Sequence, residues 1–184
     1  MTELFVKDLM VPLANYATVS EEASMLDAVL ALEKAQADYN ETTYPHRAVL
    51  VYNDKGKICG KISQLDLLKA LEPKYAQVDE PEKLSRFGYT MDFYKSIFEQ
   101  LNLWNKPLEN ICSKASTIKV KNFMYTPKED EYVDGNTGLN EAIHQLIMGC
   151  HHSLLVLNKD EIVGILRLVD VFKQVTETIK SCKL

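Results

Sequence analysis

The sequence predicts an α+β fold in which a β-α-β-β-α unit occurs twice, with a helical insert between the two copies. Two internal repeats carry this prediction. The heptapeptide Gly60–Asp66 recurs as Gly164–Asp170, each time with a Gly, an apolar strand end and an Asp six residues after the Gly. The segment Val6–Met10 recurs as Val120–Met124. Two repeats at matching places along the chain indicate a duplicated supersecondary unit.

The first copy, residues 1–72, opens with the segment at Val6 and continues into an amphipathic helix and a hairpin. Apolar residues at helical spacing predict the helix. The polar turn Asn53–Gly56 between two apolar runs predicts the hairpin. The predicted elements are a helix from about Ser24 to Asp38, the strands Ala48–Tyr52 and Lys57–Ile62, and the helix Gln64–Leu71.

The second copy, residues 117–184, follows the same plan. Asn136–Gly138 leads into apolar residues at helical spacing that start at Leu139. The turn Asn158–Asp160 again separates two apolar runs, as in a hairpin. The predicted strands are Ser153–Leu157 and Glu161–Leu166, and the closing helix is predicted from Leu168 to about Ile179.

The insert, residues 73–116, is punctuated by three prolines and carries an apolar stripe at near-helical spacing. We expect one or two helices, most clearly over Tyr94–Leu103. The stripe must cover something, and core packing is favoured over a groove for a partner. Its apolar residues are Phe93, Ile97, Phe98, Leu101, Leu103 and Trp104.

Composition excludes several classes of function. A net charge of −5 and a pI near 5.4 argue against a nucleic acid as the main partner. The four cysteines contain no C-x-x-C pair, which fits reduced thiols in a cytosol. The chain shows neither a signal-peptide pattern at its start nor an apolar run of the roughly 20 residues that a membrane helix needs. We therefore expect a cytoplasmic protein with no membrane segment.

Ser63 and Asp66 allow two interpretations. Ser63 can cap the helix that starts at Gln64, with Asp66 in the first turn, where negative charge is favoured. The same hydroxyl and carboxylate can also bind vicinal hydroxyls such as those of a ribose. One such heptapeptide decides little, but its recurrence at matching places favours a binding site.

The pattern resembles a tandem pair of cystathionine-β-synthase-type (CBS) domains. Val6–Pro12 looks like the family's opening strand, and Pro45–Val51 looks like its second strand, with a basic dipeptide before an apolar run. Gly60–Asp66 matches the family's ribose signature except at Lys61, where an apolar residue is usual. The resemblance covers about residues 1–72 and 117–180, and the insert lies outside it.

The resemblance implies two halves packed about a pseudo-two-fold axis, with two clefts for adenosine-containing ligands such as AMP, ADP, ATP or S-adenosylmethionine. In the first cleft it assigns the ribose hydroxyls to Asp66 and Ser63, and the phosphates to His46 and Arg47. A guanidinium and an imidazole suit phosphate oxygens chemically as well. The resemblance also implies that residues just after Pro12 line the adenine, among them Leu13, Thr18 and Val19.

The second copy departs from this pattern. Arg167 stands where the family has Ser or Thr, and His151 and His152 take the positions of His46 and Arg47. An Arg167–Asp170 contact, three residues apart on the helix, would close this second cleft. The alternative is an unusually basic phosphate site, and the available ion pair favours the closed interpretation.

No constellation of residues predicts an enzyme or a metal site. Cys150, His151 and His152 straddle a helix end and a strand without the spacing of a closed metal site. We expect a non-enzymatic regulatory module that binds an adenine nucleotide or S-adenosylmethionine and signals to an effector protein. The resemblance further implies a homodimer. The alternative is a scaffold or dimerisation module that keeps its clefts empty and acts through the insert.

Overall fold

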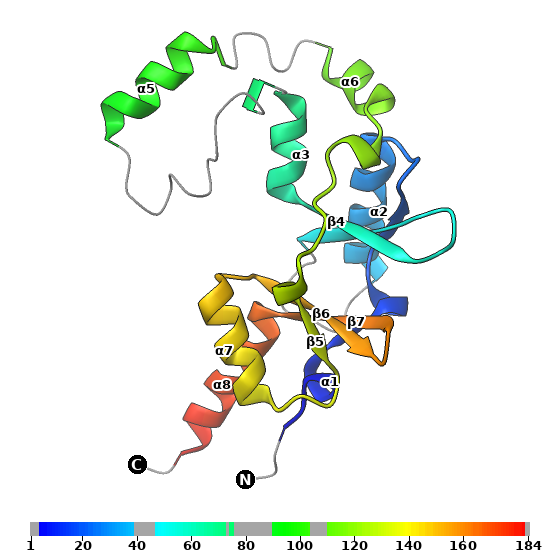
Figure 1. The fold of residues 1–184 in the computed structure, drawn as a ribbon, viewed down its shortest axis with the longest axis vertical. Coiled ribbons are helices and arrows are strands. Elements are labelled where there is room, and N and C mark those ends of the chain that lie inside the picture. Colours follow the sequence, from blue (N-terminus) through cyan, green and yellow to red (C-terminus); the bar gives the residue numbers. More distant parts are fainter. Residues whose placement is uncertain (1–3, 39–46, 73, 76–89, 104–109, 183–184) are drawn as a thin grey trace.

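The computed structural model describes residues 4–38, 47–72, 74–75, 90–103 and 110–182. It has the α+β architecture that the sequence predicts, with a separate sheet in each half (Figure 1). The first sheet has the strand order β2-β3-β4, and the second has the order β1-β7-β6-β5. In the described part of the chain, no helix is both long and apolar enough to cross a membrane.

In the first half, the helices α2 and α3 and the hairpin strands β3 and β4 follow the sequence prediction closely, whereas strand β2 was not predicted. Strand β2 pairs in parallel with β3, and β3 pairs antiparallel with β4. The residue bounds are β2 Thr18–Ser20, α2 Met25–Asp38, β3 Ala48–Tyr52, β4 Ile58–Ser63 and α3 Gln64–Leu71.

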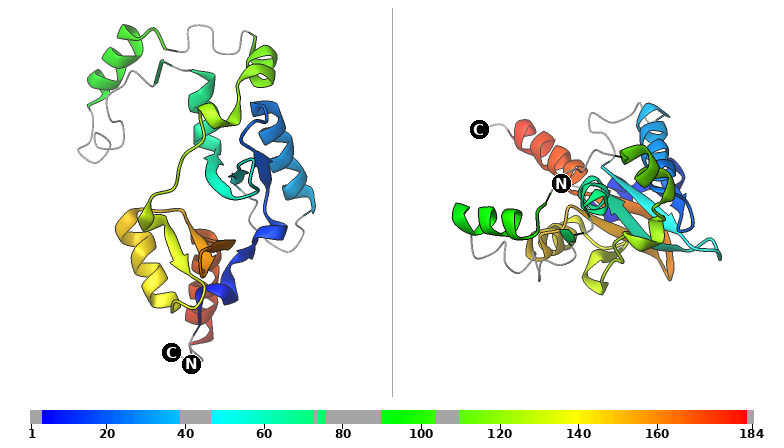
Figure 2. Two further views of the ribbon diagram at one scale, coloured as in Figure 1. Left: turned by 45° about the vertical axis from the view of Figure 1, so that its right-hand side comes forward. Right: turned by 90° about the horizontal axis from the view of Figure 1, so that it is seen from above.

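The second half repeats this arrangement. Strand β5 is parallel to β6, and β6 is antiparallel to β7, in the same register pattern as the first half. Figure 2 shows the two halves stacked, with a helix pair against each sheet. The residue bounds are β5 Tyr132–Asp134, α7 Leu139–Gly149, β6 Ser153–Asn158, β7 Glu161–Arg167 and α8 Leu168–Ser181.

The opening segment of each copy packs on the opposite half. The Val6 N–H donates to the Thr137 carbonyl at 3.0 Å, and Val6 is fully buried in the second-half core. Reciprocally, the Val120 N–H donates to the Ala23 carbonyl at 2.9 Å, and Val120 is fully buried in the first-half core. This exchange ties the halves together through main-chain bonds and apolar burial.

The opening segment was expected to be one strand over Val6–Pro12, and this was wrong. Residues Val6–Leu9 form a helical turn, α1, and only Val11–Pro12 form a strand, β1. Strand β1 pairs antiparallel with β7, so its hydrogen-bond partners lie more than 150 residues away in sequence. A local pattern carries no signal for such a distant partner.

The glycines of the two heptapeptides allow these exchanged segments to cross closely. A Cβ at Gly164 would lie 2.5 Å from the Val11 carbonyl oxygen, and one at Gly60 would lie 2.7 Å from the Met124 sulfur. A larger residue at Gly164 would displace the crossing main chain, and one at Gly60 would force the Met124 side chain to shift. The Gly at the head of each heptapeptide is thus explained by packing.

A third apolar cluster lies between the two halves. It contains residues from β1, β3, β6 and β7, so the two sheets share part of their core. Burial of this surface fixes one half against the other. Its buried members are Val11, Tyr16, Leu50, Leu155 and Ile165.

The insert contributes two described helices, α5 (Met91–Gln100) and α6 (Ile111–Thr117). Helix α6 packs against α2 and α3, whereas α5 lies apart from both sheets (Figures 1 and 2). Phe98 is exposed on α5, and Leu103 just after the helix is buried. Trp104, part of the predicted stripe, lies outside the described residues.

Candidate functional site

Ser63 and Asp66 form a capping box at the junction of β4 and α3. The Ser63 N–H and hydroxyl both donate to Asp66 Oδ2, at 2.8 and 2.6 Å, and the Asp66 N–H donates to Ser63 Oγ at 3.2 Å. Among the described residues, no donor contacts Oδ1 of Asp66. Both side chains are half-buried. The carboxylate is therefore held in place with one oxygen available to a ligand.

Arg47 lies beside this junction, at the head of β3. Its main-chain carbonyl accepts a hydrogen bond from the Gln64 N–H at 3.2 Å, and its side chain is exposed. The structure thus brings Arg47 close to Ser63 and Asp66. His46, the other predicted phosphate ligand, lies outside the described residues.

In the second half, Asp170 is occupied by the neighbouring guanidinium. Arg167 Nε donates to Asp170 Oδ2 at 2.5 Å, and Nη2 donates to Oδ1 at 2.7 Å. The two side chains are only 6% and 13% exposed. The contact expected from the i, i+3 spacing is present, and it engages both oxygens of Asp170 in a bidentate pair. A pocket of about 200 Å³ adjoins Asp170 between residues 8–11 and α8.

The two histidines of the second half have different surroundings. His151 Nε2 lies 3.1 Å from Asp130 Oδ2, and the ring packs directly over Gly149, where a Cβ would lie 2.1 Å from Nε2. The His152 carbonyl accepts from the Leu168 N–H, as Arg47 does from Gln64, and its side chain is exposed. His152 therefore matches the position of Arg47. Within the described residues, no group of His, Cys, Asp and Glu is arranged to hold a metal ion.

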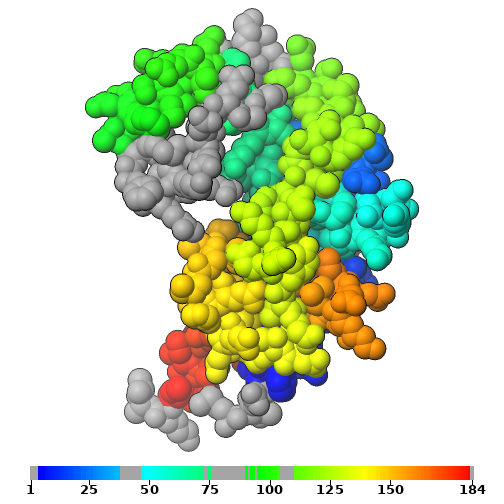
Figure 3. Space-filling model, viewed as in Figure 1, coloured from blue at the N-terminus to red at the C-terminus, as the bar shows by residue number. Residues whose placement is uncertain are grey.

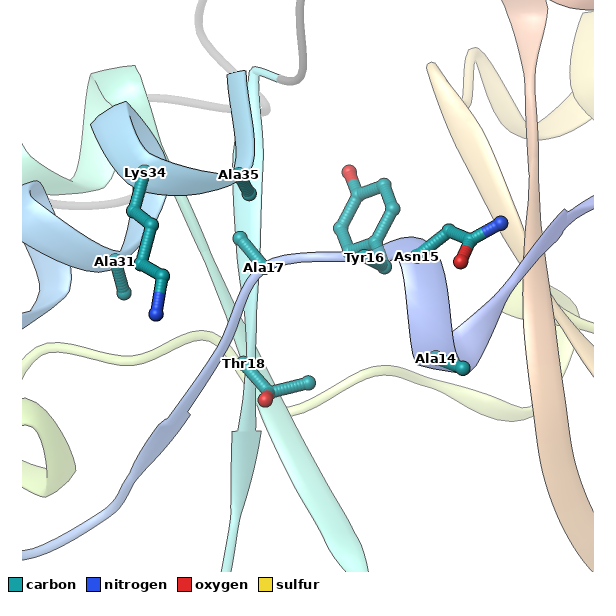
Figure 4. Close-up of a pocket in the computed structure, with 8 residues that line it drawn as sticks. All are labelled: Ala14, Asn15, Tyr16, Ala17, Thr18, Ala31, Lys34 and Ala35. Atoms are coloured by element: carbon teal, nitrogen blue, oxygen red, sulfur yellow. The ribbon is translucent and has the colours of Figure 1, made fainter. Parts of the chain in front are cut away.

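A pocket of about 370 Å³ lies beside the start of β2 (Figure 4). Its volume falls within the range of small-molecule sites. Of the three residues predicted to line the adenine, only Thr18 lines this pocket, whereas Val19 belongs to the first-half core and Leu13 packs on the central cluster. The lining consists of Ala14, Asn15, Tyr16, Ala17, Thr18, Ala31, Lys34 and Ala35.

Tyr16 connects this pocket with the second half. Burial raises the pKa of its phenol to about 12, and the charges of Arg167 and Asp170 act on it in opposite directions. The short helix η1 (Leu13–Asn15) also contacts β7. The pocket segment thus lies close to the Arg167–Asp170 pair, a neighbourhood that the sequence did not indicate.

The same segment lies at the same end of the first sheet as Ser63. Thr18 pairs with Leu50, and Ala48, two residues earlier on β3, pairs with Ser63. The start of β2 and the end of β4 are therefore at one end of the first sheet, on either side of β3 and about 10 Å apart. Of the predicted ligand-binding residues of the first half that the structure describes, all except the packed Leu13 and Val19 lie at this end of the sheet.

An ion pair that the sequence did not predict lies next to Ser63. Lys61, the departure from the family pattern, contacts the carboxylate of Glu131 in the second half. Burial alone raises the pKa of Glu131, but hydrogen bonds from Lys61, Tyr125 and Lys128 outweigh it and hold the pKa below its usual value of 4.5. The only indication of this ion pair in the sequence was Lys61 itself, a charged residue where the family pattern has an apolar one.

The fold and the site together define a duplicated α+β module with a hydroxyl–carboxylate pair at the junction of β4 and α3. The sequence-family model of the CBS domain matches residues 6–73 and 120–177, which together make up well over half of the chain. The chain therefore belongs to the CBS domain family. No functionally curated protein matches it in sequence.

Solved CBS-pair structures share the fold along nearly the whole chain. CBSX2 from Arabidopsis thaliana is 20% identical at a TM-score of 0.61, covering 98% of this chain and 100% of that one. CBSX2 in complex with AMP gives 20% identity, a TM-score of 0.58, and coverage of 95% and 98%. The CBS domain of a bacterial CNNM/CorC-family Mg²⁺ transporter in complex with ATP is 15% identical at a TM-score of 0.58. The match covers 94% of this chain and 87% of that one.

Proposed function

We propose that the chain is a non-enzymatic regulatory module that binds an adenine nucleotide in the cleft between its two CBS domains, at Ser63 and Asp66. One observation carries this proposal. Asp66 is fixed by Ser63 and, among the residues that the structure describes, no donor contacts its Oδ1, whereas both oxygens of Asp170 are engaged by Arg167. A carboxylate with a free oxygen beside a hydroxyl suits a ribose diol. We therefore assign one ribose site to the first half and regard the second as closed.

The similar structures and the charge of Arg47 support a nucleotide as the class of ligand. CBSX2 has been solved with AMP, and the transporter CBS domain with ATP, so both show nucleotides on this fold. In this chain Arg47 is exposed beside the ribose site and can fork onto phosphate oxygens. S-adenosylmethionine, which offers no phosphate to Arg47, would gain nothing from that contact.

Asp66→Ala is expected to abolish nucleotide binding, because the two ribose hydroxyls lose their acceptor. The measurement is the shift in melting temperature with AMP, ADP, ATP and S-adenosylmethionine. Asp27→Ala is a matched control, since Ser24 and Asp27 form the same capping box at the start of α2. Both changes remove a helix cap, worth about 1 kcal/mol, so only the Asp66 variant should lose the ligand shift. Equal shifts in both variants would contradict the assignment.

A regulatory module must pass its signal to a surface, and α8 provides a candidate. Four apolar residues on α8 recur at heptad spacing and are exposed, with Phe172 at 64% and Ile179 at 65%. Such a stripe suits a second copy of the same helix in a homodimer. We include this homodimer in the proposal. The four residues are Leu168, Phe172, Val175 and Ile179.

Phe172→Glu is expected to shift the chain from dimer to monomer, because it places a charge in the centre of the stripe. Sedimentation velocity measures the change. Lys180→Glu, which alters the charge of an exposed residue on the same helix, should leave the dimer intact. A monomeric wild type, or a dimer that survives Phe172→Glu, would exclude α8 as the contact.

The scaffold alternative is favoured by a single observation, the exposure of Phe93 and Phe98 on the separate helix α5. The two proposals differ in what the purified protein carries. A bound purine, seen by ultraviolet absorbance and mass spectrometry after denaturation, supports the nucleotide module. An empty protein that loses a partner on Leu101→Ala supports the scaffold.

A further inference from the structure

Lys61 joins the proposed nucleotide site to the second half by three kinds of contact. Its N–H donates to the Tyr125 carbonyl and its carbonyl accepts from the Tyr125 N–H, both at 2.9 Å. Its ammonium pairs with Glu131 and lies 5.2 Å from the centre of the Tyr125 ring. Lys61 therefore holds both ends of the segment 125–131, which leads into β5. In Figure 3 the yellow-green surface of this region runs between the first-half hairpin and α7.

Burying the Lys61–Glu131 ion pair costs free energy. The equivalent contact between the two halves, on the other side of the molecule, has no such pair. The side chains of Lys61 and Glu131 are 18% and 3% exposed, and burying two charges costs more than burying an apolar pair of similar size. The strand registers of the two halves show that Ile165 occupies the position equivalent to Lys61, and that Ala17 occupies the position equivalent to Glu131. Two buried apolar residues therefore occupy these positions on the other side. Because apolar residues serve at the equivalent positions, the presence of the Lys61–Glu131 ion pair beside the proposed nucleotide site calls for a reason other than stability.

Lys61 shares a strand face with the ribose-binding hydroxyl. Side chains alternate along β4, so Lys61 and Ser63 point to one side and Ile62, which is buried in the first-half core, points to the other. Ser63 in turn holds Asp66. A ligand that shifts Ser63 and Asp66 moves the end of the same strand that carries Lys61.

The second half continues the connection beyond Glu131. The Gln145 side-chain amide donates to the carbonyls of Asp130 and Tyr132, both at 2.8 Å, and so fastens the neighbours of Glu131 to α7. Helix α7 exposes Ile147 and Met148. Strand β4, the Lys61–Glu131 ion pair and the Gln145 hydrogen bonds together connect the proposed ribose site with the exposed apolar residues of α7.

We propose that the Lys61–Glu131 ion pair couples occupancy of the first cleft to the second half, through the segment 125–131 and α7. This inference rests on the proposed function, since it assigns the regulation of the same nucleotide site. Coupling between sites in proteins is typically 5- to 150-fold in affinity, or roughly 1–3 kcal/mol. Lys61 acts here as a positioning residue and does not itself bind the nucleotide.

The test is hydrogen exchange of the whole chain with and without AMP, in the wild type and in Lys61→Ile with Glu131→Ala. This double variant copies the pair Ile165 and Ala17 and leaves Ser63 and Asp66 untouched. In the wild type, AMP should slow exchange around residues 61–66 and also across 130–149. In the double variant, AMP should bind within about threefold of the wild-type affinity and slow exchange only around 61–66.

Two further variants separate coupling from folding. The charge-swapped variant Lys61→Glu with Glu131→Lys keeps an ion pair and should keep the slowed exchange across 130–149. Lys121→Met with Glu22→Gln removes an exposed ion pair elsewhere and should behave as the wild type. Slowed exchange across 130–149 in the Ile and Ala double variant would overturn the coupling while leaving the nucleotide site intact. A wild type without any response to AMP would instead refute the proposed function, and this inference with it.

Discussion

Replacing Lys61 alone by isoleucine is expected to lower the free energy of unfolding by about 3–5 kcal/mol. The change leaves Glu131 buried without its cation, and a stranded charge costs far more than the ion pair contributed. Urea unfolding followed by circular dichroism measures the loss. The double variant Lys61→Ile with Glu131→Ala should recover most of it, because no charge remains to be buried. A single variant as stable as the wild type would show that Glu131 reaches water.

The same pair makes stability depend on pH. Because the folded-state pKa of Glu131 lies below 4.5, its ionisation stabilises the fold above that pH. This contribution is lost as the pH falls from 4.5 through the folded-state pKa. Glu131→Gln should therefore show a weaker loss of stability in this acidic range than the wild type. Identical acid profiles for the two proteins would contradict the assigned pKa shift.

Replacing Arg167 by serine is expected to raise the number of nucleotides bound per chain from one to two. The change removes the guanidinium from both oxygens of Asp170 and restores a hydroxyl at the position that matches Ser63. The second ribose site would then resemble the first, with His152 at the position of Arg47. Isothermal titration with AMP measures the stoichiometry directly.

Two controls define the result. Adding Asp170→Ala to the Arg167→Ser background should return the stoichiometry to one, since the new site loses its acceptor. The opposite interpretation, in which Arg167 binds phosphate, requires two nucleotides on the wild type and fewer on the Arg167→Ser variant. A stoichiometry of one in both proteins would show that more than the guanidinium closes the second cleft.

Much of the fold could be predicted because its signals are local. The strand Ala48–Tyr52 and the helix Gln64–Leu71 have the predicted bounds, since alternation, turn residues and a helix cap act over a few residues. The repeat of the heptapeptide predicted the duplication. The exchange of Val6 and Val120 between the halves could not be predicted, because each partner lies in the other copy.

The candidate site divides in the same way. The capping box of Ser63 and Asp66 and the pairing of Arg167 with Asp170 follow from spacings of three residues and were predicted. The burial of Tyr16 beside Arg167 and the pairing of Lys61 with Glu131 depend on how the halves are stacked. Short-range patterns carry no information about how the halves stack. The departure from the family pattern at Lys61 did, however, mark the position of the ion pair with Glu131.

The central claim is that one ribose binds at the junction of β4 and α3 in the first half. A crystal structure of the chain with AMP tests it most directly. The account predicts a ribose hydroxyl within about 2.5–3.0 Å of Asp66 Oδ1, a phosphate near Arg47, and an intact Arg167–Asp170 pair. A ribose on Asp170, or AMP bound away from Asp66, would contradict it.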